Sequence, residues 1–186
     1  MKKRIVTIAL VIALLATCFA GTYAYLTDSY AIANTFTVGN VYIELTETGA
    51  VNGKNAYHLI PNNSYTKDPT ITLKAGSENA WIAAKITFSN KDAYALLSGG
   101  VLNTDAVILE WDENVLYVYV KASQVAEEKI ELFKALTIPE TWDNADMDKL
   151  KGMKIDVAAY AVQANGFNDC KSAMATAFAG AFPANP

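Results

Sequence analysis

The sequence predicts a mainly β protein: a jelly-roll-like antiparallel β-sandwich with a few short inserted helices, preceded by a signal-peptide helix. Two observations lead to this fold class. Short segments of alternating apolar and polar residues recur along the chain, separated by turns that contain Gly, Asn or Pro. Segments with a helical pattern are inserted among these strands and do not alternate with them, which favours an antiparallel sandwich over a parallel sheet. The 186 residues, 52% of them apolar, are sufficient for one packed domain.

The beginning of the chain has the three regions of an export signal. Basic residues Lys2–Arg4 precede an apolar run, Ile5–Ala20, that is shorter than the roughly 20 residues of a membrane-spanning helix. The small residues Thr22 and Ala24, followed by Tyr25, mark a peptidase junction, with cuts after Ala20 or after Tyr25 as alternatives. We therefore expect a secreted mature chain that contacts the membrane only through the uncleaved signal segment.

Composition after cleavage limits the classes of function. Loss of the signal takes away three basic residues and no acidic one, so the net charge falls from −4 to about −7. This acidic balance excludes a basic nucleic-acid footprint. Cys170 is then the only cysteine, which excludes an intramolecular disulfide. We expect Cys170 to be a small buried residue of a helix, with a reactive thiol or an intermolecular disulfide as alternatives. A lipid on Cys18 is disfavoured because Thr17 stands where lipoprotein signals have Gly, Ala or Ser.

Three parts of the chain follow from this pattern: a signal peptide at 1–25, an N-terminal segment at 26–36 and a single β-sandwich domain at 37–186. The segment 26–36 alternates as a strand does, with no obvious partner in the sequence. Its apolar positions on one register are Leu26, Tyr30, Ile32 and Phe36.

The domain begins with a strand expected from Phe36 to Leu45, with a bulge at Gly39-Asn40 where the apolar register shifts by one. The further strands expected from alternation are Tyr57–Ile60, Thr70–Lys74, Trp81–Phe88, Val107–Trp111, Val115–Lys121 and Lys154–Gln163. A turn expected at Pro61–Ser64 ends the first of them, Tyr57–Ile60. Helical patterns occur at Asp92–Leu97, Asn144–Leu150 and Asp169–Phe182, and residues 123–138 predict a helical turn that leads into a strand.

The residues that carry enzyme chemistry are few. His58 is the only histidine, next to Tyr57 on an expected strand, and we interpret it as a surface residue of that strand. The sequence contains no HExxH zinc motif and no glycine-rich phosphate loop. Asp143, Asp146 and Asp148 bring oxygen atoms together, but the glycine and the closing glutamate of a calcium loop are missing, and acidic residues suit a helix N-terminus. We expect no enzyme, no cofactor and no metal.

Residues 21–44 carry a resemblance to a known family. The junction Gly21-Thr22-Tyr23-Ala24-Tyr25-Leu26-Thr27-Asp28 is followed by Ala33-Asn34-Thr35-Phe36-Thr37-Val38-Gly39-Asn40-Val41-Tyr42-Ile43-Glu44. This stretch resembles the TasA/camelysin family of exported proteins of Gram-positive bacteria, whose signal peptides are cut by a SipW-type peptidase. Over the first 45 residues the resemblance is strong, and it is weak beyond them, at His58–Pro61, Tyr65–Pro69 and Ala158–Gly166.

The resemblance implies a jelly-roll subunit of extracellular biofilm-matrix fibres, in which each subunit lends its freed N-terminal segment to the sheet of the next. The donor residues would be Leu26, Tyr30, Ile32 and Phe36, and the partners would be the SipW-type peptidase and either other copies of the chain or other matrix proteins. Camelysin is credited with metalloprotease activity, which the single histidine does not support, so we do not carry it over.

Two other functions compete with a fibre subunit. One is a monomeric cell-surface binding module or adhesin, which would hold glycans on exposed aromatic residues such as Trp81, Trp111 or Trp142. The other is a secreted hydrolase, which would need His58.

Overall fold

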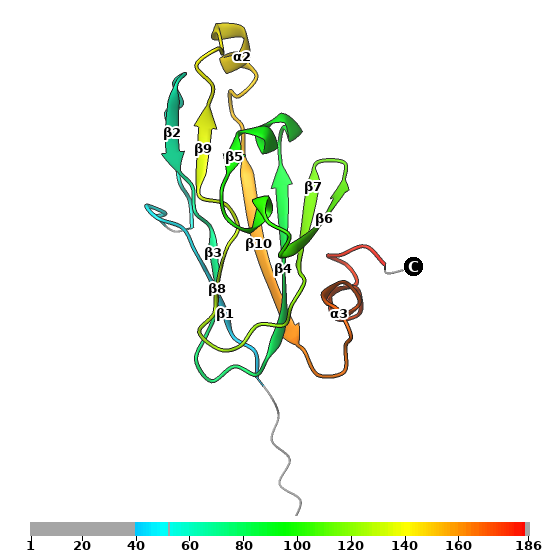
Figure 1. The fold of residues 1–186 in the computed structure, drawn as a ribbon. Helices are drawn as coiled ribbons and strands as arrows, with labels where there is room; N and C mark the ends of the chain where they lie inside the picture. Colours follow the sequence, from blue (N-terminus) through cyan, green and yellow to red (C-terminus); the bar gives the residue numbers. More distant parts are fainter. Residues whose placement is uncertain (1–39, 52, 185–186) are drawn as a thin grey trace, which may run out of the picture. The chain divides into compact units, whose positions relative to one another are not determined.

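The computed structural model describes residues 40–51 and 53–184 (Figure 1). The expected signal peptide, its junction at Thr22, Ala24 and Tyr25, and the expected donor residues Leu26, Tyr30, Ile32 and Phe36 lie outside the described residues. The described residues belong to one compact unit, Val38–Pro186. None of the helices within them is long and apolar enough to cross a membrane.

Antiparallel sheets dominate the unit, as predicted. The longest sheet has the order β10-β4-β7-β6, and we call it the long sheet. Its strands are β10 (Ile155–Gln163), β4 (Ala80–Phe88), β7 (Val115–Val120) and β6 (Val107–Asp112). All pairings in it are antiparallel, and β6 and β7 form the expected hairpin. The alternation of the sequence therefore located all four strands of this sheet to within a residue or two.

Two three-stranded sheets form the second layer. One contains β1 (Ile43–Thr46), β3 (Thr70–Leu73) and β8 (Lys129–Glu131), and the other β2 (Asn63–Thr66), β9 (Ala135–Ile138) and β5 (Leu97–Ser98). The β2–β9 pair continues into the β3–β8 pair, because the amide of Lys67 donates to the carbonyl of Lys134 and the amide of Leu132 to that of Pro69. The result is a β-sandwich; its jelly-roll connectivity stays a prediction.

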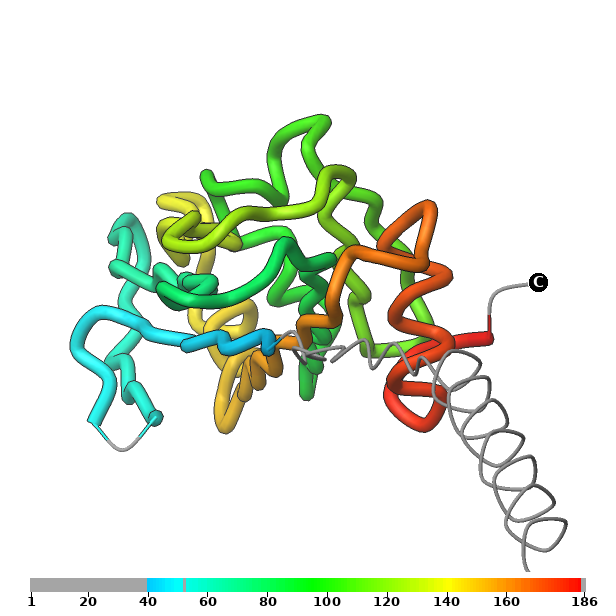
Figure 2. The backbone as a smooth tube through the Cα atoms, turned by 90° about the horizontal axis from the view of Figure 1, so that it is seen from below, coloured from blue at the N-terminus to red at the C-terminus, as the bar shows by residue number. Residues whose placement is uncertain are grey.

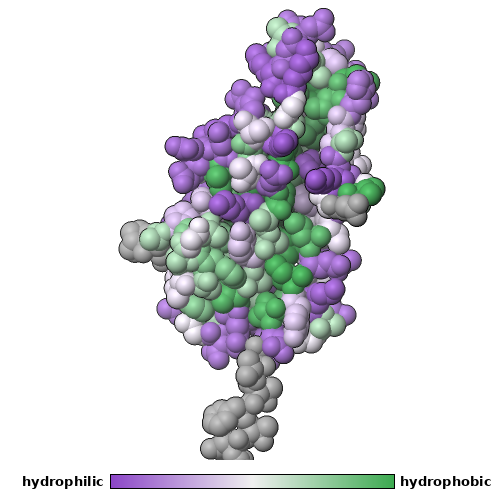
Figure 3. Space-filling model, turned by 180° about the vertical axis from the view of Figure 1, so that it is seen from behind, coloured by the Kyte–Doolittle hydropathy of each residue, from purple (hydrophilic) through white to green (hydrophobic). Residues whose placement is uncertain are grey.

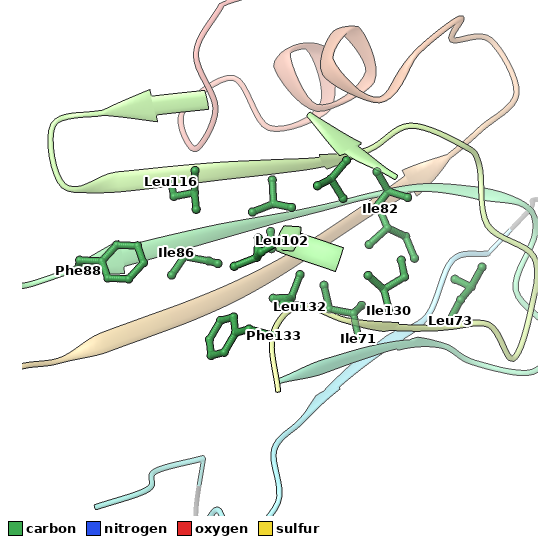
Figure 4. Close-up of a cluster of buried hydrophobic side chains, with 14 of the residues drawn as sticks. Ile71, Leu73, Ile82, Ile86, Phe88, Leu102, Leu116, Ile130, Leu132 and Phe133 are labelled. Atoms are coloured by element: carbon green, nitrogen blue, oxygen red, sulfur yellow. The ribbon is translucent and has the colours of Figure 1, made fainter. Parts of the chain in front are cut away.

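The main core lies between the layers, as the view in Figure 4 shows. Because successive side chains of a strand point to opposite faces, one register of β4 faces this core and the other faces away. The fully buried side chains of the core come from β3, β4, β7 and the β8–β9 region: Ile71, Leu73, Ile82, Ile86, Phe88, Leu116, Leu132 and Phe133. Burial of these side chains stabilises the fold by about 1.5–3 kcal/mol each relative to exposure.

The outer face of the long sheet is also covered. Helix α3 (Cys170–Ala177) and the residues after it pack there, and Figure 2 shows this red and orange end of the chain on the side opposite the blue β1 and the cyan segment after it. The second register of β4 and β10 supplies Trp81, Ala83, Tyr160 and Val162 to this cluster. The long sheet is therefore sandwiched between the second layer and α3.

Two short helices connect the strands near the positions expected, η1 (Lys91–Leu96) and α2 (Asn144–Asp148). A third, η2 (Val101–Asn103), was not predicted. Asp143 begins α2 with a capping box, accepting from the amide of Asp146 while the Asp146 carboxylate accepts from the amide of Asp143. The acidic cluster predicted to suit a helix N-terminus is placed there.

Two predicted elements between residues 57 and 66 are wrong. Tyr57–Ile60 is not a strand, and β2 occupies Asn63–Thr66, where we expected a turn. The Tyr65 hydroxyl donates to the carbonyl of His58 and accepts from the amide of Ile60, so a side chain takes the backbone groups that a strand would pair. The strand forms where β9 offers a partner.

Residues 123–138 contain two short strands, β8 and β9, and no helical turn. Glu127 has a φ of 71°, which a right-handed helix does not allow, and its amide donates to Leu73. Helix α3 is also shorter than the expected Asp169–Phe182. It ends at Ala177 because Phe178 and Phe182 turn back onto the long sheet.

Candidate functional site

Among the strands that the structure describes, β10 has a hydrogen-bonded neighbour on one side only. β10 pairs with β4 over all nine of its residues, from Ile155 opposite Phe88 to Gln163 opposite Ala80. Among the described residues, no backbone group of Ile155–Gln163 bonds anything other than β4. A row of unpaired amides and carbonyls along a strand is a template on which another strand can be added.

Natural proteins protect such edges with proline, lysine, bulges or short strands. β10 has none of these: its sequence contains no proline or glycine, its register with β4 is unbroken, and its only charged residue is Asp156. At nine residues it is longer than a typical strand. The edge is therefore long, regular and apolar.

The core is only partly covered next to this edge. Strand β1 lies beside β10 without pairing with it. The core-facing side chains of the two strands are half-buried, and Leu45 is 38% exposed, whereas Ile71 opposite it on β3 is fully buried. We call this region the β1–β10 seam; its residues are Ile43, Leu45, Val157, Ala159 and Ala161. Figure 3 shows that hydrophobic residues also gather on the molecular surface, on the face seen from behind.

The three tryptophans do not form one platform. Trp81 is 9% exposed and packs beneath α3, Trp111 packs beside Phe88 and Tyr94 next to the main core, and Trp142 packs against a third cluster. Lys91 lies over the Trp111 ring at 4.8 Å from its centroid. A glycan-binding surface built on these three rings together has no support in this arrangement.

The predicted chemical residues are also dispersed. His58 is exposed, and the structure brings none of the other candidate residues to it. Asp146 and Asp148 pair with Lys149 and Lys151 at 2.7 Å each. Among residues 40–51 and 53–184, no group of three or more metal-binding side chains comes together.

Cys170 is buried, as expected for a small core residue. Its thiol donates to the carbonyl of Ile82 at 3.2 Å. Burial raises the pKa of the Cys170 thiol to about 12, so the group stays protonated and unreactive at neutral pH.

A polar cluster that the sequence did not predict lies at the end of β1, and we call it the Glu47 cluster. One oxygen of the carboxylate, Oε1, accepts from Asn55 Nδ2 at 2.8 Å, from the Tyr57 hydroxyl at 2.8 Å and from Lys67 Nζ at 3.1 Å. Lys67 is only 7% exposed and lies against the rings of Tyr57 and Phe133. The four polar residues come from three segments, at residues 47, 55–57 and 67, so no single motif in the sequence indicates the cluster.

The electrostatics of the cluster follow from these contacts. Burial alone raises the pKa of Glu47, but hydrogen bonds from Asn55 and Tyr57 and the charge of Lys67 outweigh it, so the pKa lies below the usual value. Burial and the neighbouring carboxylate raise the pKa of the Tyr57 hydroxyl well above its usual range. An open polar hollow adjoins the cluster, lined by Thr46, Glu47, Thr48, Asp68, Thr70, Thr72 and Lys129.

No family model, curated protein or solved structure matches this chain.

Proposed function

We propose that this chain is a secreted structural protein whose subunits assemble into extracellular biofilm-matrix fibres by donor-strand exchange. Residues 26–36 of one subunit would add as a strand to the β10 edge of the next. The observation that carries this proposal is the bare nine-residue edge of β10 next to the half-covered β1–β10 seam.

The donor segment has the pattern that this edge requires. It is long enough to pair with all of β10, and it alternates with Leu26, Tyr30, Ile32 and Phe36 on one register. In an added strand this register would face the partly exposed apolar side chains of the seam, while backbone hydrogen bonds supply affinity. The added strand would then bury the half-exposed side chains of the seam, as the side chains of the main core are already buried.

The position of the segment directly after the expected cleavage site would explain how assembly is controlled and why it gives a polymer. Before cleavage the same residues continue an apolar export signal, and cleavage near Tyr25 releases them for pairing. Because a donor end and an acceptor edge are different surfaces, each subunit keeps one free site of each kind, and a head-to-tail contact of this sort gives a filament.

The test places charges on the two registers of the donor. In the processed protein, Tyr30→Asp with Ile32→Asp puts two carboxylates into the seam and should abolish fibres in electron microscopy and sedimentation. The matched control, Ala31→Asp with Ala33→Asp, adds the same charges on the other register and should leave fibres. Fibres from both variants, or none from the unaltered protein, would contradict the proposal.

A second experiment distinguishes exchange between subunits from folding back within one subunit. A synthetic peptide of residues 26–36 in excess should occupy free β10 edges and shorten the fibres, and the same peptide with Ser at positions 30 and 32 should not. If residues 26–36 already pair with the β10 edge of their own subunit, neither peptide should change the length of the fibres.

A further inference from the structure

The Glu47 cluster combines three groups that can form a covalent bond without any other reagent. We propose that Lys67 and Asn55 form an intramolecular isopeptide bond, with Glu47 as the proton relay between them. This inference stands apart from fibre assembly, because it rests on side chains at the end of β1 and not on the β10 edge.

The nucleophile and the leaving group are held by the same atom. Lys67 Nζ and Asn55 Nδ2 both donate to Glu47 Oε1, at 3.1 and 2.8 Å, so the two nitrogens lie within two hydrogen-bond lengths of each other. Asn55 Nδ2 also donates to the carbonyl of Thr48 at 3.0 Å, which fixes the side-chain amide in place. Positioning of two reacting groups in this way removes most of the entropic cost of their encounter.

The Lys67 amine is held away from bulk solvent. The side chain is almost completely buried, and its ammonium group bonds only the Glu47 carboxylate, with the rings of Tyr57 and Phe133 on its other sides. Among the described residues, Glu47 is the carboxylate that Nζ contacts, so it is the group that would take a proton from Lys67 and leave a neutral pair.

Hydrogen counting supports that neutral state. Tyr57 has one hydroxyl proton but two acceptors within reach, Glu47 Oε1 at 2.8 Å and the carbonyl of Thr66 at 3.0 Å. If Tyr57 donates to Thr66, a protonated Glu47 can donate to the Tyr57 oxygen, and every group is then satisfied. The lowered pKa of Glu47 makes the ion pair the resting state of the cluster, so the neutral pair is the state through which the reaction would pass.

The reaction balances within the cluster. Lys67 gives a proton to Glu47, and the free electron pair of Nζ attacks Asn55 Cγ to form a C–N bond. Glu47 then passes its proton to Nδ2, and the Cγ–Nδ2 bond breaks to release ammonia. Nζ loses its second proton to the Glu47 carboxylate, which transfers it to the departing ammonia. Glu47 ends as it began. The open polar hollow that Glu47 lines gives ammonia a route to solvent.

The bond would have a structural consequence. It closes a ring over residues 55–67, which contains Pro61 and all of β2. A pulling force that enters through β1 would then pass from Asn55 to Lys67 directly, and the residues between them would not extend.

The test is the intact mass of the full-length chain, or of its processed form, after incubation of the folded protein. The bond removes one ammonia, so the mass should fall about 17 Da below that of the sequence, and a branched peptide should link residues 55 and 67 after digestion. An unchanged mass after prolonged incubation would overturn the proposal.

Two variants separate this bond from other losses of ammonia, such as ring closure at the Asn52-Gly53 pair. Lys67→Arg keeps the ion pair with Glu47 but has no nucleophilic amine, so the mass should stay that of the sequence. Asn55→Asp should lose water in place of ammonia, about 18 Da from its own mass. Loss of ammonia that persists in Lys67→Arg would contradict the assignment.

Discussion

The two edges of the long sheet differ in how they meet solvent. The β6 edge is six residues long, carries Glu110 and Asp112, and is tied to α3 by the ion pair between Lys171 and Glu110 at 2.6 Å. The β10 edge is nine residues long and has a single charge, and none of its described side chains forms an ion pair. Both edges belong to the same sheet, so the difference is one of protection and not of fold. Among the described residues, the β6 edge is shielded and the β10 edge is bare, and this contrast is the basis of the proposed assembly.

The largest effect expected from this comparison is on assembly. Val157→Lys places a charge in the β1–β10 seam, where an added strand would bury it, and should abolish fibres. Ile108→Lys makes the same change on β6, at a side chain that is 44% exposed, and should leave fibres intact. Sedimentation measures the outcome, with thermal unfolding to establish that both variants fold. Equal loss of fibres in the two variants would remove the distinction between the edges.

The cover on the outer face of the long sheet should contribute to the stability of the subunit. Phe182 packs against Tyr117, Tyr119 and Tyr160. Phe182→Ala should lower the free energy of unfolding by about 3–5 kcal/mol, as expected for a buried aromatic side chain. Chemical denaturation measures it. A loss below about 1 kcal/mol would mean that the C-terminal residues do not cover the sheet in solution.

Acid should weaken the Glu47 cluster, which lies away from the β10 edge. The pKa of Glu47 in the folded chain is below its usual value of 4.5, so unfolded chains bind the proton more readily. The stabilisation is complete above about pH 5 and is lost as the pH falls through the folded pKa. Unfolding free energies measured from pH 7 to pH 3 on Lys67→Arg, which keeps the ion pair, should show this slope, and Glu47→Gln in the same background should reduce it.

The smallest effect concerns the ion pair that shields β6. Lys171→Ala should cost at most about 1 kcal/mol, because both side chains are partly solvated and such pairs contribute little. The variant should not create a second assembly edge on its own, since Asp112 and the shorter strand remain. Branched or thickened fibres in electron microscopy would show that this one ion pair is what protects the β6 edge.

Much of the fold could be predicted from the alternation of residues. The β4 and β10 patterns gave the correct strands and the correct two faces, because each face packs against an apolar partner. Prediction failed where pairing depended on distant residues. Tyr57–Ile60 has the composition of a strand, but the Tyr65 side chain occupies the backbone of His58 and Ile60. β2 formed at polar residues because β9 lies beside them.

The sequence by itself determined the four strands of the long sheet, their buried faces, the acidic composition and the single buried thiol, since each depends on local pattern or composition. It also supplied the expected export junction and the expected donor pattern on which the proposed function depends. Only the tertiary structure decided which strand stands at the edge of the long sheet, and that Glu47, Asn55 and Lys67 meet on one carboxylate oxygen. The physical reason is that alternation specifies which side of a strand is apolar, whereas sheet order and side-chain encounters are set by contacts between residues far apart in the chain.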